Sequence, residues 1–154
     1  MSIPYQRTLA SNASLEGTSL HTGEKVTLTM KPAPPNHGIV FRRIDLEDMP
    51  FIPANVDNVQ QVERATTLAV GSVKVHTVEH VISALAGMEI DNALIEMDAN
   101  EPPIGDGSAA PYVRCIKEAG IVEQEELASV FEIREPIHYE NENGSIITII
   151  PSKD

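Results

Sequence analysis

The residues best suited to chemistry lie in one short segment, where His76, Glu79, His80 and Ser83 follow the spacing i, i+3, i+4, i+7. On a helix this spacing places all four side chains on one side. Two imidazoles and a carboxylate in such a stripe could bind a metal ion and activate its water. The positive end of the helix dipole would keep a histidine neutral, as a ligand must be. An ordinary surface helix also carries a polar stripe opposite an apolar one, so the segment alone leaves both interpretations open.

The same segment matches the inverted zincin signature H-x-x-E-H, in which both histidines bind zinc and the glutamate is the base. Thr77 is a natural N-cap residue, which would place His76 outside the helix and away from the stripe. The chain is also short for such a protease, and no later glutamate lies in a helical ligand motif. A zinc protease using His76, Glu79 and His80 is one alternative function, and a non-catalytic interaction domain is another.

The elements that must position these residues are mostly strands in the first hundred residues. Residues 26–30 alternate apolar and polar side chains, and residues 39–41 follow a Pro-Pro-Asn-His-Gly turn. Residues 93–97 are mostly apolar, as in a buried strand. Residues 66–70 and 73–75 flank Gly71-Ser72, which predicts a tight hairpin.

Two helices are expected among these strands. The first spans residues 78–86 and ends at Gly87, with an apolar stripe that we assign to the core: Val78, Val81, Ile82 and Leu85. The second spans residues 109–119 and ends at Gly120. Asp106 or Ser108 can cap it, Pro111 lies in its first turn, and Ile116 is expected to face the sheet.

The composition changes after Gly120. Glu123, Glu125 and Glu126 predict a solvated acidic connector. Residues 130–139 and 145–150 predict a strand pair across a turn that contains Asn-Gly. A lone hairpin is marginally stable by itself, so we expect this one to open a second domain that has been cut away.

Charge and composition exclude several classes of function. The net charge of −12 in 154 residues disfavours nucleic acid as a partner. Lys31, Arg42 and Arg43 form a small cationic group that we expect on a solvated sheet face. No apolar run approaches the ~20 residues needed to span a bilayer, and the start lacks a secretory signal. The single cysteine, Cys115, fits a reducing cytoplasm and the edge of a core.

Three segments resemble, in order and spacing, motifs of the zinc-dependent UDP-3-O-acyl-N-acetylglucosamine deacetylases of lipid A biosynthesis. Residues 77–96, TVEHVISALAGMEIDNALIE, are similar to the family's T-V-E-H helix and the I-D-N strand after it. Residues 17–23, GTSLHTG, are similar to its G-x-x-L-H-T-G turn. Residues 101–109, EPPIGDGSA, are similar to its E-x-P-I-x-D-G-S-A loop.

The resemblance implies an α+β fold, in which a mainly antiparallel sheet packs with two helices in two layers. Residues 1–126 would be the first deacetylase domain, with a small sheet insertion at about 56–75, and residues 127–154 would begin the truncated second domain.

The resemblance also implies roles for matching positions. His80 would be a zinc ligand, and Glu79 the general base that deprotonates the zinc-bound water. The family has no fixed histidine at His76. The other four positions would line or brace the cleft or border the acyl passage: His21, Asp106, Thr66 and Thr67. Each also has a plain structural interpretation, in turn hydrogen bonds, helix capping or strand packing.

The family's remaining zinc ligands come from an H-K-x-x-D helix that does not occur here. His138 and Glu142 have a similar interval, but their Asn-Gly context predicts a hairpin. The resemblance implies one Zn²⁺, completed by ligands outside this chain, and UDP-3-O-acyl-N-acetylglucosamine as substrate. We therefore expect the 154-residue chain alone to bind zinc poorly and to be inactive. Its cleft wall or its 130–150 hairpin could support self-association.

Overall fold

The computed structural model describes residues 3–152, and its centre is a five-stranded sheet in the order β2-β3-β9-β4-β5. Neighbouring strands are antiparallel except β4 and β9, which run parallel. The strands are β2 (Ala13–Thr18), β3 (Lys25–Pro32), β4 (Ile39–Arg43), β5 (Phe51–Pro53) and β9 (Ala93–Met97). The strands predicted at 26–30, 39–41 and 93–97 are therefore confirmed.

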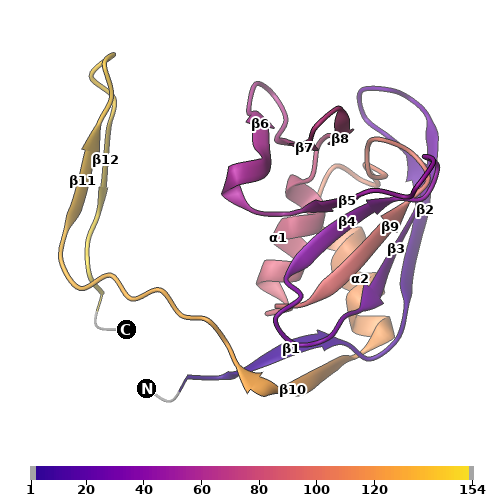
Figure 1. Ribbon diagram of the computed structural model, residues 1–154, viewed down its shortest axis with the longest axis horizontal. Coiled ribbons are helices and arrows are strands. Elements are labelled where there is room, and N and C mark those ends of the chain that lie inside the picture. Colours follow the sequence, from indigo (N-terminus) through magenta and orange to yellow (C-terminus); the bar gives the residue numbers. More distant parts are fainter. Residues whose placement is uncertain (1–2, 153–154) are drawn as a thin grey trace.

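Both α-helices of the described residues pack on one face of this sheet (Figure 1). They are α1 (Glu79–Gly87) and α2 (Ala110–Ala119). Between the layers lies a core built from every second residue of the strands and one side of each helix. Its largest members include Leu28, Met30, Phe41, Ile95, Met97, Leu85, Tyr112 and Ile116. The predicted two-layer α+β fold is confirmed.

The apolar stripe of α1 is buried as predicted, but the end of the helix differs from the prediction. Gly87 is the last helical residue, and the positive φ of 54° falls at Glu89 instead. The turn closes because Glu89 N–H donates to Ala86 O (3.0 Å) and Ile90 N–H donates to Leu85 O (2.9 Å). Because of these bonds, the helix includes Gly87, whereas the sequence pattern predicts an end just before Gly87.

The start of α2 is capped from outside the helix. Ser108 Oγ accepts the Ala110 N–H (3.1 Å), while Asp106 Oδ1 accepts from the Ser108 hydroxyl (2.7 Å) and amide (3.0 Å). Asp106 therefore acts through Ser108 and not on the helix itself. Pro111 lies in the first turn, and Gly120 ends the helix with φ 77°, both as predicted.

The acidic segment after Gly120 is a strand, so the prediction of a solvated connector was wrong. β10 (Ile121–Leu127) pairs antiparallel with β1 (Tyr5–Leu9). Arg7 lies opposite Glu123 in the register, which places opposite charges on facing residues. The glutamate side chains are exposed, while the backbone hydrogen-bonds to β1. The local composition did not reveal the strand because the pairing depends on a distant segment.

A small three-stranded sheet packs beside β5. Its strands fall within residues 56–75, the range of the predicted insertion. It follows a short 3₁₀ turn, η1 (Val56–Asn58), and consists of β6 (Val59–Gln61), β7 (Thr67–Val70) and β8 (Val73–Val75). β7 and β8 form the hairpin predicted around Gly71-Ser72. Both contact β5, which connects the small sheet to the central one.

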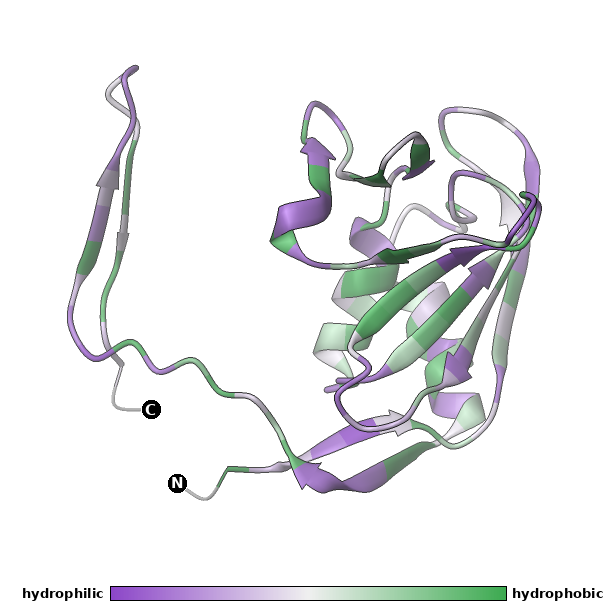
Figure 2. Cartoon of the chain, viewed as in Figure 1, coloured by the Kyte–Doolittle hydropathy of each residue, from purple (hydrophilic) through white to green (hydrophobic). Residues whose placement is uncertain are grey.

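The last described strands, β11 (Ile137–Glu140) and β12 (Ile146–Ile149), form a hairpin that stands apart from the rest (Figure 1). Both strands are shorter than predicted. Apolar residues remain exposed along the hairpin and the segment leading to it, as the green stretches of Figure 2 show. None of the described helices is long and apolar enough to cross a membrane.

Candidate active site

The three segments that carry the sequence motifs meet at the N-terminus of α1. The turn at residues 19–24 closes through Ser19 N–H donating to Glu24 O (3.0 Å). The loop at residues 101–108 runs beside it, because Ile104 N–H donates to Thr18 O (3.0 Å) and Ser19 pairs with Pro103 in an isolated bridge. The loop reaches α1 through Gly107 O, which lies 3.2 Å from His80 Nε2, and Glu101 of the same loop joins the turn to Thr77, just before α1.

Glu79 and His80 occupy the first turn of α1. Glu79 Oε1 accepts the backbone N–H of Thr66, and His80 Nε2 lies 3.2 Å from Gly107 O. A carbonyl oxygen only accepts hydrogen bonds, so Nε2 carries the hydrogen of this contact, and in the neutral ring the lone pair is then on Nδ1. Metal-binding histidines have this pattern, with one ring nitrogen donating to a carbonyl and the other free to bind.

Glu101 is the fully buried acid of the site, with 0% of its surface exposed. Its Oε2 accepts the N–H groups of His21 (2.9 Å) and Thr22 (3.1 Å), and its Oε1 accepts the Thr77 hydroxyl (2.7 Å). Burial raises the pKa of Glu101, but these hydrogen bonds outweigh it and leave the pKa below the usual value. The carboxylate is therefore ionised at neutral pH.

Thr77 does not cap α1, which corrects the sequence prediction. The N-cap is Val78, which makes no side-chain capping bond, and the Thr77 hydroxyl points to Glu101 instead. Thr77 has φ 54°, a left-handed conformation that is unusual for a β-branched residue. Such strain costs about 1–3 kcal/mol, and it gathers at functional sites where the surroundings enforce it.

His76 lies before α1 and is not part of a helical stripe with Glu79 and His80. Its backbone N–H donates to Asn100 O (2.8 Å), and its Nδ1 lies 3.0 Å from Thr67 Oγ1. Burial lowers the pKa of His76, and the negative charge of Glu101 opposes this effect without overcoming it. The i, i+3, i+4 arrangement that a protease would need is absent from this segment.

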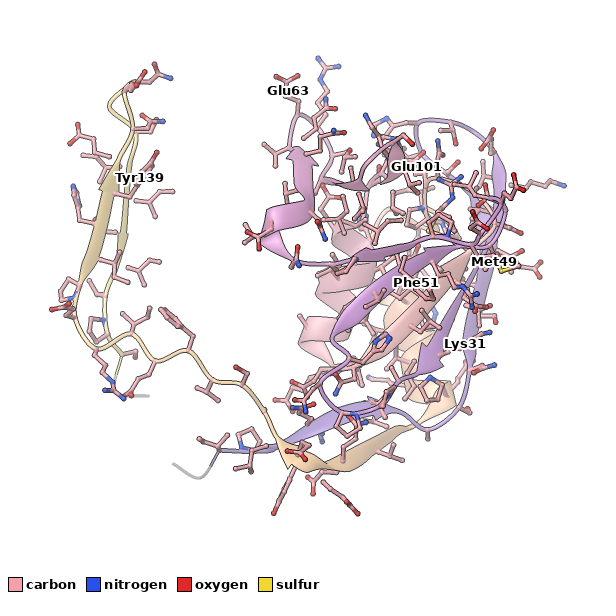
Figure 3. The ribbon with its side chains drawn as sticks, viewed as in Figure 1. Lys31, Met49, Phe51, Glu63, Glu101 and Tyr139 are labelled. Carbon is pink, nitrogen blue, oxygen red and sulfur yellow. The ribbon has the colours of Figure 1, made fainter. Side chains whose placement is uncertain are left out.

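A cavity of about 360 Å³ opens between the 19–24 turn and the small sheet. Its lining includes His21, Thr67, His76 and Glu101. In Figure 3, Glu101 lies among the loops at this end of the sheet, and Glu63 lies on the loop between β6 and β7. The cavity thus contains two of the predicted site residues, His21 and Thr67, but not Glu79 or His80.

The two remaining predicted site residues, Thr66 and Asp106, make hydrogen bonds near Glu79 and Gly107. Thr66 presents its amide to Glu79, and its carbonyl accepts the Val78 N–H (3.4 Å), so its backbone and not its side chain makes these contacts. Asp106 is exposed near Gly107, and hydrogen bonds from Ser108 lower its pKa. Glu101 was present in the quoted motif but not identified as a site residue, because nothing local to an acid before two prolines reveals its burial.

Three basic side chains of the sheet, Lys31, Arg42 and Arg43, pair with acids. Glu96 pairs with Lys31 (2.5 Å) and Arg42 (3.4 Å), and the guanidinium of Arg42 lies 5.0 Å from the centre of the Phe51 ring. This agrees with the predicted sheet face for Lys31 and Arg42. Arg43 differs, because it is buried, pairs with Asp45 (2.6 Å) and donates to Lys74 O (2.9 Å).

Within residues 3–152, no three or more side chains of His, Cys, Asp or Glu gather closely enough to hold a metal ion. His80 is the predicted ligand, and Glu79 beside it is held by Thr66. The fold and this site define an α+β domain that presents a carboxylate and an imidazole, Glu79 and His80, on the first turn of one helix.

Comparison with known proteins identifies the family. The model of the UDP-3-O-acyl N-acetylglycosamine deacetylase family matches residues 6–154, and the chain belongs to this family. A deacetylase of Legionella pneumophila named for UDP-3-O-acyl-N-acetylglucosamine is 50% identical over 96% of this chain and 48% of its own length. One from Saccharophagus degradans is 52% identical over 86% of this chain and 44% of its own length.

A third relative is the bifunctional enzyme LpxC/FabZ of Chlorobaculum tepidum, which is 48% identical over 92% of this chain and 30% of its own length. The chain therefore spans between about a third and a half of the length of these curated relatives.

Proposed function

We propose that this chain is the N-terminal domain of a zinc-dependent enzyme that deacetylates UDP-3-O-acyl-N-acetylglucosamine, releasing acetate and a free amine in lipid A biosynthesis in the cytoplasm. Residues 1–126 would form the domain, and residues 127–154 would begin the second. The observation that carries the proposal is the pair Glu79 and His80 at the start of α1, within a chain of this family.

The described residues suit half of a zinc site. A catalytic zinc has three protein ligands and one open position, and here His80 offers one imidazole nitrogen with a lone pair. Zinc, when bound, supplies Lewis acidity toward water and the acetamide carbonyl.

Glu79 is the proposed general base. The Thr66 amide holds its Oε1, which orients the carboxylate and leaves Oε2 to take the proton of the attacking water. His21, Thr67 and the cavity beside them are proposed to border the substrate, and Asp106 to brace the loop that carries Gly107. The protease alternative loses its support, because His76 hydrogen-bonds Thr67 away from the helix.

Two measurements test this proposal. In the complete enzyme, Glu79→Gln should retain zinc and lose about 10²–10⁴-fold in deacetylation, because the carboxylate is a base and not a ligand. His76→Ala is the control and should leave zinc content unchanged. Near-normal turnover of the Glu79→Gln variant would overturn the assignment, and loss of zinc from His76→Ala would restore the protease.

The 154-residue chain provides an independent test. After dialysis it should hold no stoichiometric zinc and release no acetate from the acylated UDP-sugar, because one imidazole binds zinc only weakly. Tight zinc in a one-to-one ratio would show that the remaining ligands lie within this chain. Self-association through the exposed hairpin stays a prediction, measured by sedimentation of the same sample.

A further inference from the structure

A buried carboxylate is costly unless the protein supplies partners for it. Glu101 is fully buried, yet none of the ion pairs among the described residues includes it. Its partners are three neutral donors, the amides of His21 and Thr22 and the hydroxyl of Thr77. Its hydrogen bonds therefore join it to the 19–24 turn and to Thr77, and not to a charged donor.

The two oxygens of Glu101 serve two different elements. Oε2 binds the 19–24 turn through His21 and Thr22, and Oε1 binds Thr77, which directly precedes the residues that begin α1. The carboxylate is planar and its oxygens are a fixed distance apart, so it sets the position of one element relative to the other. These elements lie 80 and 24 residues from Glu101 in sequence.

The backbone that carries Glu101 is itself fixed. Pro102 and Pro103 follow it, and proline restricts both its own φ and the residue before it. The Pro103 carbonyl accepts the hydroxyl of buried Tyr112 from α2. A Cβ on Gly17 would come within 3.0 Å of Pro103 Cβ, which shows how closely β2 packs on this loop.

From these contacts we propose that Glu101 is a positioning residue: its carboxylate locks the His21 turn to the left-handed Thr77 backbone, and so fixes His21 relative to Glu79 and His80. The hydrogen bonds do not depend on the reaction. The inference rests on the proposed function only in treating His21, Glu79 and His80 as residues of the active site. The carboxylate acts through the groups that it binds, because Glu101 itself is fully buried.

The test uses nuclear magnetic resonance on the 154-residue chain, with Glu101→Asp as the main variant. Aspartate keeps the charge but is one methylene shorter, so it cannot reach both elements at once. The residual dipolar couplings of the His21 and Thr22 amides should then no longer fit the alignment tensor that fits α1 and α2. At least one set of signals, from His21 and Thr22 or from Thr77, should lose its hydrogen-bonded shift.

Two further variants separate positioning from general stability. Glu101→Gln should restore the wild-type couplings, because its carbonyl can accept both amides and its NH₂ can donate to the Thr77 hydroxyl. Asn92→Ala removes another buried polar group, which accepts the Gly38 amide (2.8 Å) far from the site, and should leave all these signals in place.

Unchanged couplings and shifts in Glu101→Asp would overturn the proposal, and so would equal changes in Asn92→Ala. In Glu101→Asp or Glu101→Ala, solvent exchange of the His21 and Thr22 amides should speed up about tenfold or more when the bond to a charged acceptor is lost. None of these readouts depends on turnover, so they can fail or succeed independently of the deacetylase assignment.

Discussion

Replacing Thr77 by valine removes the hydroxyl that donates a hydrogen bond to buried Glu101. Valine has nearly the same shape as threonine. The lost bond is 2.7 Å long, and both residues are buried, so no solvent replaces it. A hydrogen bond to a charged group contributes about 1.5–3 kcal/mol. Valine is also β-branched and keeps the strain of the left-handed backbone, so no relief offsets the loss.

We therefore expect Thr77→Val to lower the free energy of unfolding by about 2 kcal/mol. For a chain of this size that corresponds to a fall in Tm of roughly 4–8 °C. Thr77→Ser is the matched control, because it keeps the hydroxyl and should cost less than about 1 kcal/mol. Urea unfolding at pH 7, followed by far-ultraviolet circular dichroism, gives both values by linear extrapolation.

The pH dependence sharpens this test. The folded-state pKa of Glu101 is lowered, so its ionised form stabilises the protein at neutral pH and this stability is lost as the pH falls through the folded-state value. The difference between Thr77→Val and Thr77→Ser should shrink over the same range, because a protonated acid is a weaker acceptor. If the two variants unfold within about 0.5 kcal/mol of each other at pH 7, the hydroxyl bond does not stabilise this site.

Two further predictions follow from the backbone and from His76. Gly105→Ala should destabilise the chain more than Gly107→Ala: both glycines have positive φ, but only at Gly105 would a Cβ clash, 2.8 Å from Pro111 Cγ. Equal midpoints in urea would contradict this reasoning. His76 should titrate below 6.5 by nuclear magnetic resonance, and Glu101→Gln should lower its pKa further by removing a negative charge. Stability should accordingly fall as the pH drops below 6.5, where the unfolded state gains the proton first. A His76 pKa at or above 6.5 would refute the conclusion that burial lowers it.

Much of the fold follows from local sequence patterns. The alternation in residues 26–30 and the apolar spacing from Val78 to Leu85 determine the strand and the helix face, because burial on one side selects these periods directly. Glu79 and His80 are chain neighbours at the start of that helix, so their proximity needed no tertiary information. The Gly120 stop and the hairpin around Gly71-Ser72 are equally local.

The pairings between distant segments were decided by the tertiary structure alone. β10 is a strand because β1, more than a hundred residues earlier, offers it a ladder, although its glutamates suggested a loop. Thr77 does not cap the helix because buried Glu101 accepts its hydroxyl. His76 lies outside the helix, as expected, but the sequence did not reveal that its partner is Thr67 on β7. Local sequence patterns were enough to identify the groups that could do chemistry and the helix on which they lie. Only the packing of loops far apart in the chain decided what holds them in place, because a buried hydrogen bond depends on partners that local sequence patterns do not reveal.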